Sequence, residues 1–157
     1  VALAVPLYAQ LPRLKAMFLP LAVSLVIGSL VAIVSAVGIA WALGASRETM
    51  LSLAPKSVTT PIAMGIAEKL GGLPSLTAVL VVTTGVVGAV SAKYVLDALA
   101  IADHAVRGFS VGVAAHGIGT ARAFQVSEEA GAFAGLGMGL NGLATAALFP
   151  LLVWLAL

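Results

Sequence analysis

Three long runs without a charged residue constrain the fold more than any other feature of this sequence. They are Phe18–Leu43, Leu70–Ala92 and Ala130–Leu157. A transmembrane helix needs about 20 consecutive apolar residues, so each run is long enough to cross a bilayer. Because the bilayer core holds no water, a backbone inside it must satisfy its own hydrogen bonds, as an α-helix does. The runs therefore predict an all-α, polytopic integral membrane protein.

The composition supports the same fold class. Hydrophobic residues make up 61% of the chain and charged residues 9%, whereas soluble domains carry about 25% charged residues. So few charges cannot cover a water-exposed surface, and we expect one transmembrane domain over residues 1–157. The net charge of +2 comes from scattered residues, which gives no indication of a nucleic-acid partner.

The spacing of charges, glycines and prolines predicts which helices are continuous. Long helices are expected near Phe18–Leu43, Ser75–Ala100 and Ala130–Leu157. Two shorter segments, Thr49–Leu70 and Gly108–Arg122, are expected to be interrupted helices that break or re-enter within the membrane. Such segments are tolerated at membrane depth only where protein or a wet cavity covers the freed backbone groups.

The first interrupted segment carries a lone charge. Between Glu48 and Glu68 the only charged residue is Lys56, and a lysine near the middle of a span costs about 2.5–3.5 kcal/mol on insertion scales. A helix that restarts at Pro61 presents free N–H groups and about half a positive charge to its surroundings. We therefore expect a binding site for a small carboxylate. Its candidate residues are Lys56, Ser57, Thr59 and Thr60.

The second interrupted segment contains a histidine, two glycines, a threonine and an arginine. Each glycine costs about 1 kcal/mol in a helix relative to alanine, so the helix is expected to unwind around His116–Thr120. Arginine holds a carboxylate in a forked grip, and histidine can carry a proton near neutral pH. The candidate residues are His116, Gly117, Gly119, Thr120 and Arg122, joined by Asn141 from the last run. We expect the two segments to meet near mid-membrane around a polar cavity.

The same residues also admit structural interpretations. Lys56 could extend to the membrane interface or pair with Glu68 or Asp97. His116 could bind a backbone carbonyl, and Arg122 could serve as an interfacial anchor. The sequence leaves these alternatives open.

Enzyme and metal signatures are missing from the sequence. The chain has no cysteine and two histidines, and these histidines lack the helical spacing of a zinc site. No nucleophile elbow, Walker motif or dinucleotide-binding loop occurs in a usable context. We therefore expect neither an enzyme nor a bound cofactor or metal.

Two patterns concern helix packing and symmetry. Glycines recur at Gly131, Gly135, Gly139 and Gly142, which predicts a stripe facing another helix at close range. In addition, Val1–Arg13 and Val111–Arg122 are both short interrupted segments that end in an arginine, and each is followed by a long apolar helix. Paired segments of this kind are typical of transporters built from inverted repeats.

Three stretches resemble one known family. They are V-A-L-A-V-P-L-Y at Val1–Tyr8, L-A-P-K-S-V-T-T-P-I-A-M at Leu53–Met64, and Ala114–Asn141, which contains A-A-H-G-I-G-T-A-R-A and G-A-F-A-G-L-G-M-G-L-N. In these motifs the chain resembles the LrgB/CidB family of bacterial membrane proteins. The resemblance implies a place in the bacterial cytoplasmic (inner) membrane. It also implies that the chain lacks the first helices of the family, whose members are longer at the N-terminus.

The resemblance implies two functions. One is transport of small monocarboxylates such as pyruvate, glycolate or glycerate, because the family is similar to the plastidal glycolate/glycerate translocator. The other is an antiholin-like role, modulating murein hydrolase export and lysis together with an LrgA/CidA-type membrane protein. An interaction subunit without its own substrate is a third possibility. The residues favour transport, since a scaffold needs no lysine in a broken helix, and we expect a homo-oligomer.

Overall fold

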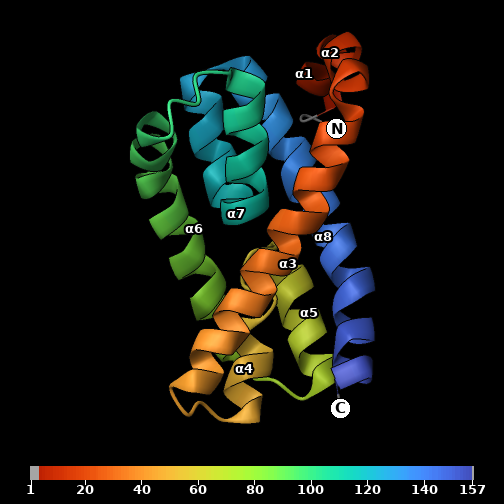
Figure 1. The fold of residues 1–157 in the computed structure, drawn as a ribbon, viewed down its shortest axis with the longest axis vertical. Helices are drawn as coiled ribbons and strands as arrows, with labels where there is room; N and C mark the ends of the chain where they lie inside the picture. The colour runs from red at the N-terminus through yellow and green to blue at the C-terminus, as the bar shows by residue number, and fades with distance from the viewer. Residues whose placement is uncertain (1–3, 157) are drawn as a thin grey trace.

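The computed structural model describes residues 4–156, and all regular elements in that range are helices (Figure 1). They are α1 (Ala4–Ala9), α2 (Leu11–Ala16), α3 (Phe18–Ala42), α4 (Arg47–Leu53), α5 (Thr60–Leu70), α6 (Pro74–Ala98), α7 (His104–Val126) and α8 (Glu128–Ala156). Three of them, α3, α6 and α8, contain stretches long and apolar enough to cross a membrane. The all-α prediction and the three long helices are confirmed, although Val1 to Leu3 and Leu157 lie outside the described residues.

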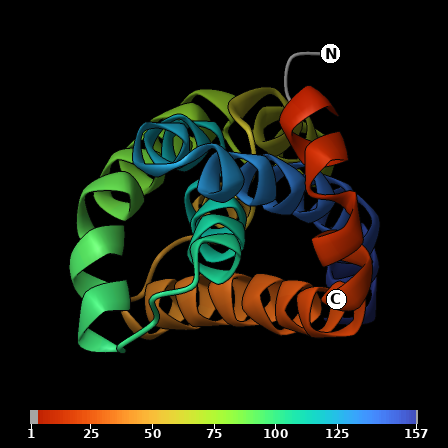
Figure 2. The same cartoon turned by 90° about the horizontal axis from the view of Figure 1, so that it is seen from above.

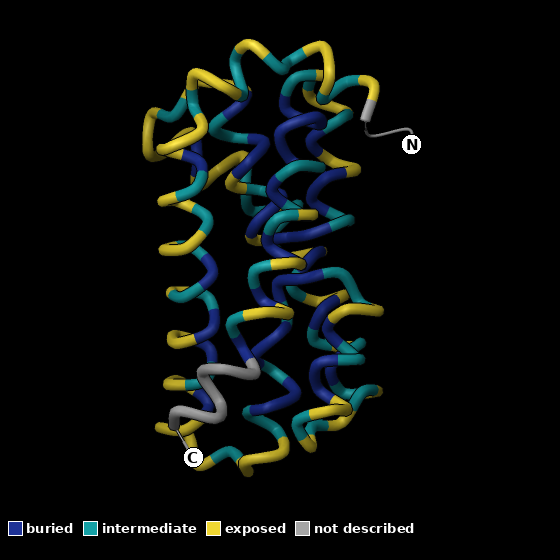
Figure 3. The backbone as a smooth tube through the Cα atoms, turned by 90° about the vertical axis from the view of Figure 1, so that its right-hand side faces the viewer, coloured by how far each residue is buried: buried dark blue, intermediate teal, exposed yellow. Residues whose placement is uncertain are grey.

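Seen from above, α3, α6 and α8 lie around α7, which occupies the middle of the molecule (Figure 2). Buried residues gather along α7 and the part of α8 beside it, whereas α3 and α6 expose much of their surface (Figure 3). Helices that expose long apolar faces suit a lipid environment, in which an apolar surface needs no covering.

The first interrupted segment forms a helical hairpin. The chain leaves α4 at Leu53 and restarts at Thr60, one residue before the predicted Pro61, and α5 ends on Gly71 in the left-handed conformation (φ 85°). Beyond α5, the N–H of Leu73 donates to Ser52 Oγ of α4 at 2.7 Å, and Thr77 Oγ1 donates to the Ser52 carbonyl at 3.0 Å. The chain therefore returns to the side of α4. Residues 54–59 form the turn of this hairpin, which we call the first tip.

The second interrupted segment, α7, also reverses direction. Its backbone is non-helical at Ala115 (φ −124°, ψ 15°) and His116 (φ 42°, ψ −133°). His104 Nδ1 at its start lies 3.0 Å from Oγ of Ser127, the residue after its end. A continuous helix of 23 residues would hold its ends about 33 Å apart. Residues 104–114 are therefore a first arm, residues 117–126 a second arm, and residues 115–116 the second tip.

The break in α7 lies earlier than predicted. We expected unwinding over His116–Thr120, but Gly117 and Gly119 are helical residues of the second arm. The chain turns at His116 instead, although a positive φ in a sparsely populated region of backbone space costs a non-glycine residue about 1–3 kcal/mol. Gly119 serves close packing: a Cβ placed there would lie 2.7 Å from the Ala115 Cβ and 2.8 Å from a methyl of Val111 on the first arm.

The backbones of α7 and α8 approach each other very closely where the two helices cross. The glycines that allow this approach lie mainly on α7. A Cβ built on Gly108 would lie 2.1 Å from the Ala130 carbonyl oxygen, and one on Gly112 would lie 2.0 Å from that of Ala134. The predicted glycine stripe of α8 is wrong at Gly139, which is exposed with nothing within 4 Å of its Cβ position.

Gly131 and Gly142 do meet neighbouring side chains, at Phe124 and Ile62. At the start of α8, Ser127 Oγ accepts a hydrogen bond from the Ala130 N–H at 3.0 Å, as a helix N-cap does.

An ion-pair cluster fixes α2 against the rest of the molecule. Arg13 pairs with Asp103, which caps the first arm of α7, and with Glu129 in the first turn of α8. Both ends of the α7 hairpin therefore lie beside the same arginine, which agrees with the reversal at His116.

The α7–α8 crossing predicts a contrast between two glycines. Gly112→Val should reduce the yield of folded protein sharply, because overpacking costs about 1–3 kcal/mol and the obstructing atom is a backbone oxygen. Gly139→Val should have little effect, because its Cβ position is open. Size-exclusion chromatography of the detergent-extracted variants measures the folded yield. Equal loss of yield in both variants would contradict this account of the crossing.

Candidate functional site

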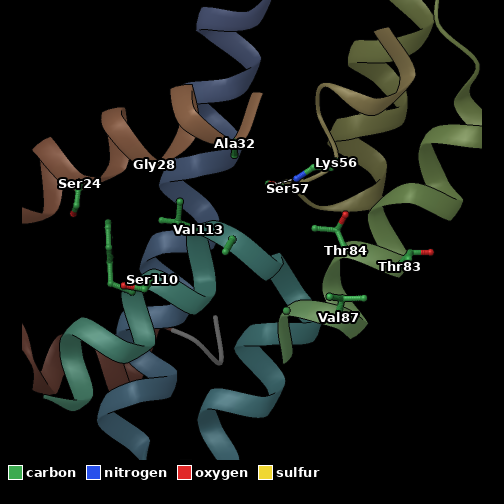
Figure 4. A pocket seen from close by; sticks show the side chains of 13 residues that line it. Ser24, Gly28, Ala32, Lys56, Ser57, Thr83, Thr84, Val87, Ser110 and Val113 are labelled. Carbon is green, nitrogen blue, oxygen red and sulfur yellow. Dashed lines mark hydrogen bonds between the residues drawn. The ribbon is translucent and has the colours of Figure 1, made fainter. Parts of the chain in front are cut away.

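A cavity of about 560 Å³ lies between α3, α6 and the first arm of α7, and the first tip contributes Lys56 and Ser57 to its wall (Figure 4). Lys56 is the only charged residue among those lining it. Each of these four elements contributes a hydroxyl group to the wall: Ser24 from α3, Ser57 from the first tip, Thr83 and Thr84 from α6, and Ser110 from α7. The volume falls in the range of small-molecule sites, which is roughly 300–1,000 Å³.

Lys56 reaches neither of the carboxylates that we considered as partners. Its Nζ lies 3.4 Å from Ser57 Oγ, while Asp97 accepts instead from Lys93 Nζ at 2.6 Å and Arg107 Nη1 at 2.7 Å. Among the described residues no carboxylate lies within ion-pair distance of Lys56. A half-buried ammonium whose one bonded partner is a hydroxyl can attract an anion into the cavity.

Asn141 joins the two tips from the middle of α8. Its Nδ2 donates to the Ser57 carbonyl of the first tip at 3.1 Å and to the Val113 carbonyl, two residues before the second tip, at 2.9 Å. Its Oδ1 accepts from Ser29 Oγ of α3 at 2.6 Å. The side chain is 1% exposed. One amide therefore connects α3, the first tip, α7 and α8.

His116 seats the second tip against α6. Its Nε2 lies 2.9 Å from the Val81 carbonyl oxygen, so the histidine does bind a backbone carbonyl, one of the two alternatives the sequence left open. Gly85 makes room for the ring, since a Cβ there would lie 2.7 Å from His116 Cε1. Thr120 Oγ1 donates to the His116 carbonyl at 2.8 Å and so stabilises the turn from the second arm.

The predicted candidates do not all share one cavity. Lys56 and Ser57 line the first cavity, with Thr59 and Thr60 following at the start of α5. His116, Gly117, Gly119 and Thr120 form the second tip and the beginning of the second arm. Arg122, which we expected to meet Lys56, lines a different cavity with Lys93 and Arg107. The hairpin explains this separation, because Arg122 lies near the end of the second arm, away from the tip.

Sequence reasoning missed the hydroxyl residues of the long helices. Ser24, Thr83 and Ser110 line the cavity, yet each also donates to a carbonyl of its own helix, at Leu21, Val79 and Val106. Isolated Ser and Thr residues in an apolar helix carry no signal that distinguishes a cavity wall from a lipid-facing surface. Within the described part of the chain, no three His, Cys, Asp or Glu residues gather as a metal site.

Comparison with known proteins identifies the family. The model of the LrgB-like family matches residues 1–155. This chain belongs to the LrgB-like family. No solved structure gives a significant match.

Several curated relatives cover almost the whole chain. YwbG of Bacillus subtilis is 38% identical over 98% of this chain and 68% of its own length. An uncharacterized protein of Haemophilus influenzae is 35% identical over 96% of this chain and 65% of its own length. The holin-like protein CidB of Staphylococcus epidermidis is 30% identical over 99% of this chain and 68% of its own length. The chain thus spans about two thirds of these relatives and is an LrgB/CidB-family membrane protein.

The contacts of Asn141 predict its effect on stability. Asn141→Leu should leave the Ser57 and Val113 carbonyls without their amide donor, and each unsatisfied buried group costs about 1–3 kcal/mol. Ser29→Ala should cost less, because both tip carbonyls keep their donors. Thermal unfolding of the purified proteins in detergent compares the two. A Tm of Asn141→Leu equal to or above that of Ser29→Ala would contradict the proposed junction.

Proposed function

We propose that this chain forms the substrate-binding part of a membrane transporter for small monocarboxylates such as pyruvate, glycolate or glycerate. The observation that carries the proposal is Lys56, the one charged residue lining a cavity that otherwise offers hydroxyls and apolar side chains. A transporter must bind its substrate without enclosing it permanently. One cation, the Ser57 hydroxyl and the positive end of α5 suit that need, because they bind a carboxylate more weakly than several fixed charges would.

The substrate carboxylate is proposed to lie near Lys56 Nζ, with the Ser57 hydroxyl and the start of α5 beside it. Pro61 occupies the first turn of α5, and Thr59 precedes it without a capping bond from its side chain. The helix therefore presents its positive end toward the first tip, which favours an anion. The small residues Gly28 and Gly88 line the cavity at α3 and α6 and leave room for the rest of the acid.

His116 is proposed to link transport to a proton. Its Nε2 faces the Val81 carbonyl, so the neutral ring donates there and Nδ1 is the nitrogen that would accept a proton. Protonation would alter a ring that fixes the second tip, whose neighbour Ala114 lines the cavity. A change at His116 would thus reach the substrate without direct contact.

The two hairpins are proposed to re-enter the membrane from opposite faces of the bacterial inner membrane. In this arrangement α4–α5 followed by α6, and α7 followed by α8, form the two halves of an inverted repeat. This pairing replaces the one suggested by Val1–Arg13, where the described residues form the short helices α1 and α2. Paired broken helices that meet near the bilayer midplane are the common construction of secondary transporters.

A second function is favoured by the relatives. CidB of Staphylococcus epidermidis and of Staphylococcus aureus is named holin-like. In that role the chain would act with an LrgA/CidA-type membrane protein and modulate murein hydrolase export, and the cavity would need no substrate. A homo-oligomer is compatible with both functions. Uptake into proteoliposomes that contain this protein alone distinguishes them, because only the transporter requires activity without a partner.

Removal of the Lys56 charge tests the transport proposal. Lys56→Ala should reduce uptake of labelled pyruvate or glycolate into proteoliposomes to the level of empty vesicles, because the cavity loses the one cation among its lining residues. Lys69→Ala is the matched control, since it removes a lysine that is exposed near the end of α5. Full uptake by Lys56→Ala, or equal loss in both variants, would reject the proposed site.

A further inference from the structure

A second cavity of about 190 Å³ lies between α6 and the two arms of α7. Three cations line it, Lys93 from α6 and Arg107 and Arg122 from the two arms. The hairpin brings the two arginines to one end of the molecule, because each lies about one turn from the end of its arm. Lys93 lies at a similar distance from the end of α6. This is the depth at which a membrane helix passes from hydrocarbon into the headgroup region.

The charges around this cavity do not cancel. Asp97 is bonded to both Lys93 and Arg107, and Arg107 Nη1 also donates to the Ile101 carbonyl at 2.9 Å. Arg122 Nη1 donates to Gln125 Oε1 at 2.8 Å, a neutral group on its own helix. Three cations therefore line the cavity, and the carboxylate of Asp97 pairs with two of them.

The charge of Arg13, at the same end of the molecule, is balanced by acidic partners. It is paired with two carboxylates, Asp103 and Glu129. The Val106 N–H and Arg13 hold the pKa of Asp103 below its usual range, so that partner stays ionised.

An apolar groove continues from the cationic cavity toward the second tip. It has a volume of about 200 Å³ and shares Ala92, Leu96 and Val111 with the cavity. It then runs between α6 and α7 past Val95 and Ala114 to Ala115. A cationic site at headgroup depth thus opens into an apolar channel that leads to the middle of the molecule.

We propose that this cavity and groove bind one anionic phospholipid. The phosphate group lies among Lys93, Arg107 and Arg122, and an acyl chain lies in the groove. Arginine suits a phosphate because its guanidinium can donate two parallel hydrogen bonds, and basic pockets between membrane helices commonly bind lipid headgroups. A free phosphate or a soluble phosphoester would occupy the cationic part but would gain nothing from the groove. The inference does not depend on which substrate the first cavity binds.

The lipid occupant would connect the α7 hairpin to α6 at the membrane surface. Arg107 and Arg122 come from opposite arms of one hairpin, and Lys93 comes from the helix against which its tip is seated. One phosphate shared by the three would oppose separation of the arms. We therefore expect anionic lipid to stabilise the folded protein as well as bind to it.

Lipid titration of the purified full chain in detergent tests the proposal. Phosphatidylglycerol should bind and raise Tm, whereas phosphatidylcholine and, at the same concentration, soluble glycerol phosphate should do so much less. Arg122→Gln should weaken phosphatidylglycerol binding about fivefold, because a basic residue at an anionic membrane surface contributes about that factor. Arg122→Lys should weaken it less. Lys69→Gln is the control, since it removes a cation outside both cavities.

Three outcomes would overturn the proposal. Equal binding of phosphatidylcholine and phosphatidylglycerol would exclude recognition of the charge. An equal Tm rise with glycerol phosphate would make the cavity a site for small anions rather than lipid. Unchanged phosphatidylglycerol affinity in both Arg122→Gln and Lys93→Gln would place the lipid elsewhere. Lys93 is well exposed, so the second variant remains informative if the first fails to fold.

Discussion

The buried amide of Asn141 is the interaction on which the two hairpins depend. A chain that breaks its helices inside an apolar environment must find donors for the carbonyls that lose their helical partners. Asn141 supplies two such donors at once, one to Ser57 and one near the second tip, and its own oxygen is satisfied by Ser29 of α3. Because all three bonds come from one side chain, the positions of the tips are coupled. A shift of either tip would leave a buried polar group unpaired.

Helix α6 complements Asn141 from the other side. Gly85 and Gly88 make room for His116 and Ala115 of the second tip, and the Val81 carbonyl accepts the histidine ring. The first tip reaches the same helix, since Val58 packs with Val81 in one small apolar cluster. The cavity with Lys56 lies beside this junction and is walled partly by α6. The proposed transport site therefore lies beside the place where hydrogen bonds and close packing hold the two tips together.

Much of the fold could be predicted from charge-free runs and prolines, because a membrane helix is specified by length and apolar composition. The bounds of α3 and α6 follow from that rule, and α5 ends at Gly71 because glycine adopts the positive φ required there at little cost. The interruption of α7 was predicted from its glycines, but the exact position of the turn, at Ala115 and His116, could not be. The turn falls on His116 rather than on the neighbouring glycines, since α6 offers it a carbonyl and a space. This tertiary contact also explains why Arg122 lines a different cavity from Lys56. Asn141 was predicted as a substrate-binding residue, whereas its role as a connector between the tips required the structure.

The most direct test of this account is the membrane sidedness of residues that flank the two hairpins. The chain has no cysteine, so single cysteines can be introduced at exposed positions: Glu48→Cys and Lys69→Cys beside the first hairpin, Ala102→Cys and Glu128→Cys beside the second. A membrane-impermeant maleimide applied to each face of sealed vesicles reports the side of each residue. The account predicts that Glu48→Cys and Lys69→Cys react from one face and that Ala102→Cys and Glu128→Cys react together from the other. Reaction of Ala102→Cys and Glu128→Cys from opposite faces would mean that α7 crosses the membrane, and would contradict the meeting of two re-entrant tips.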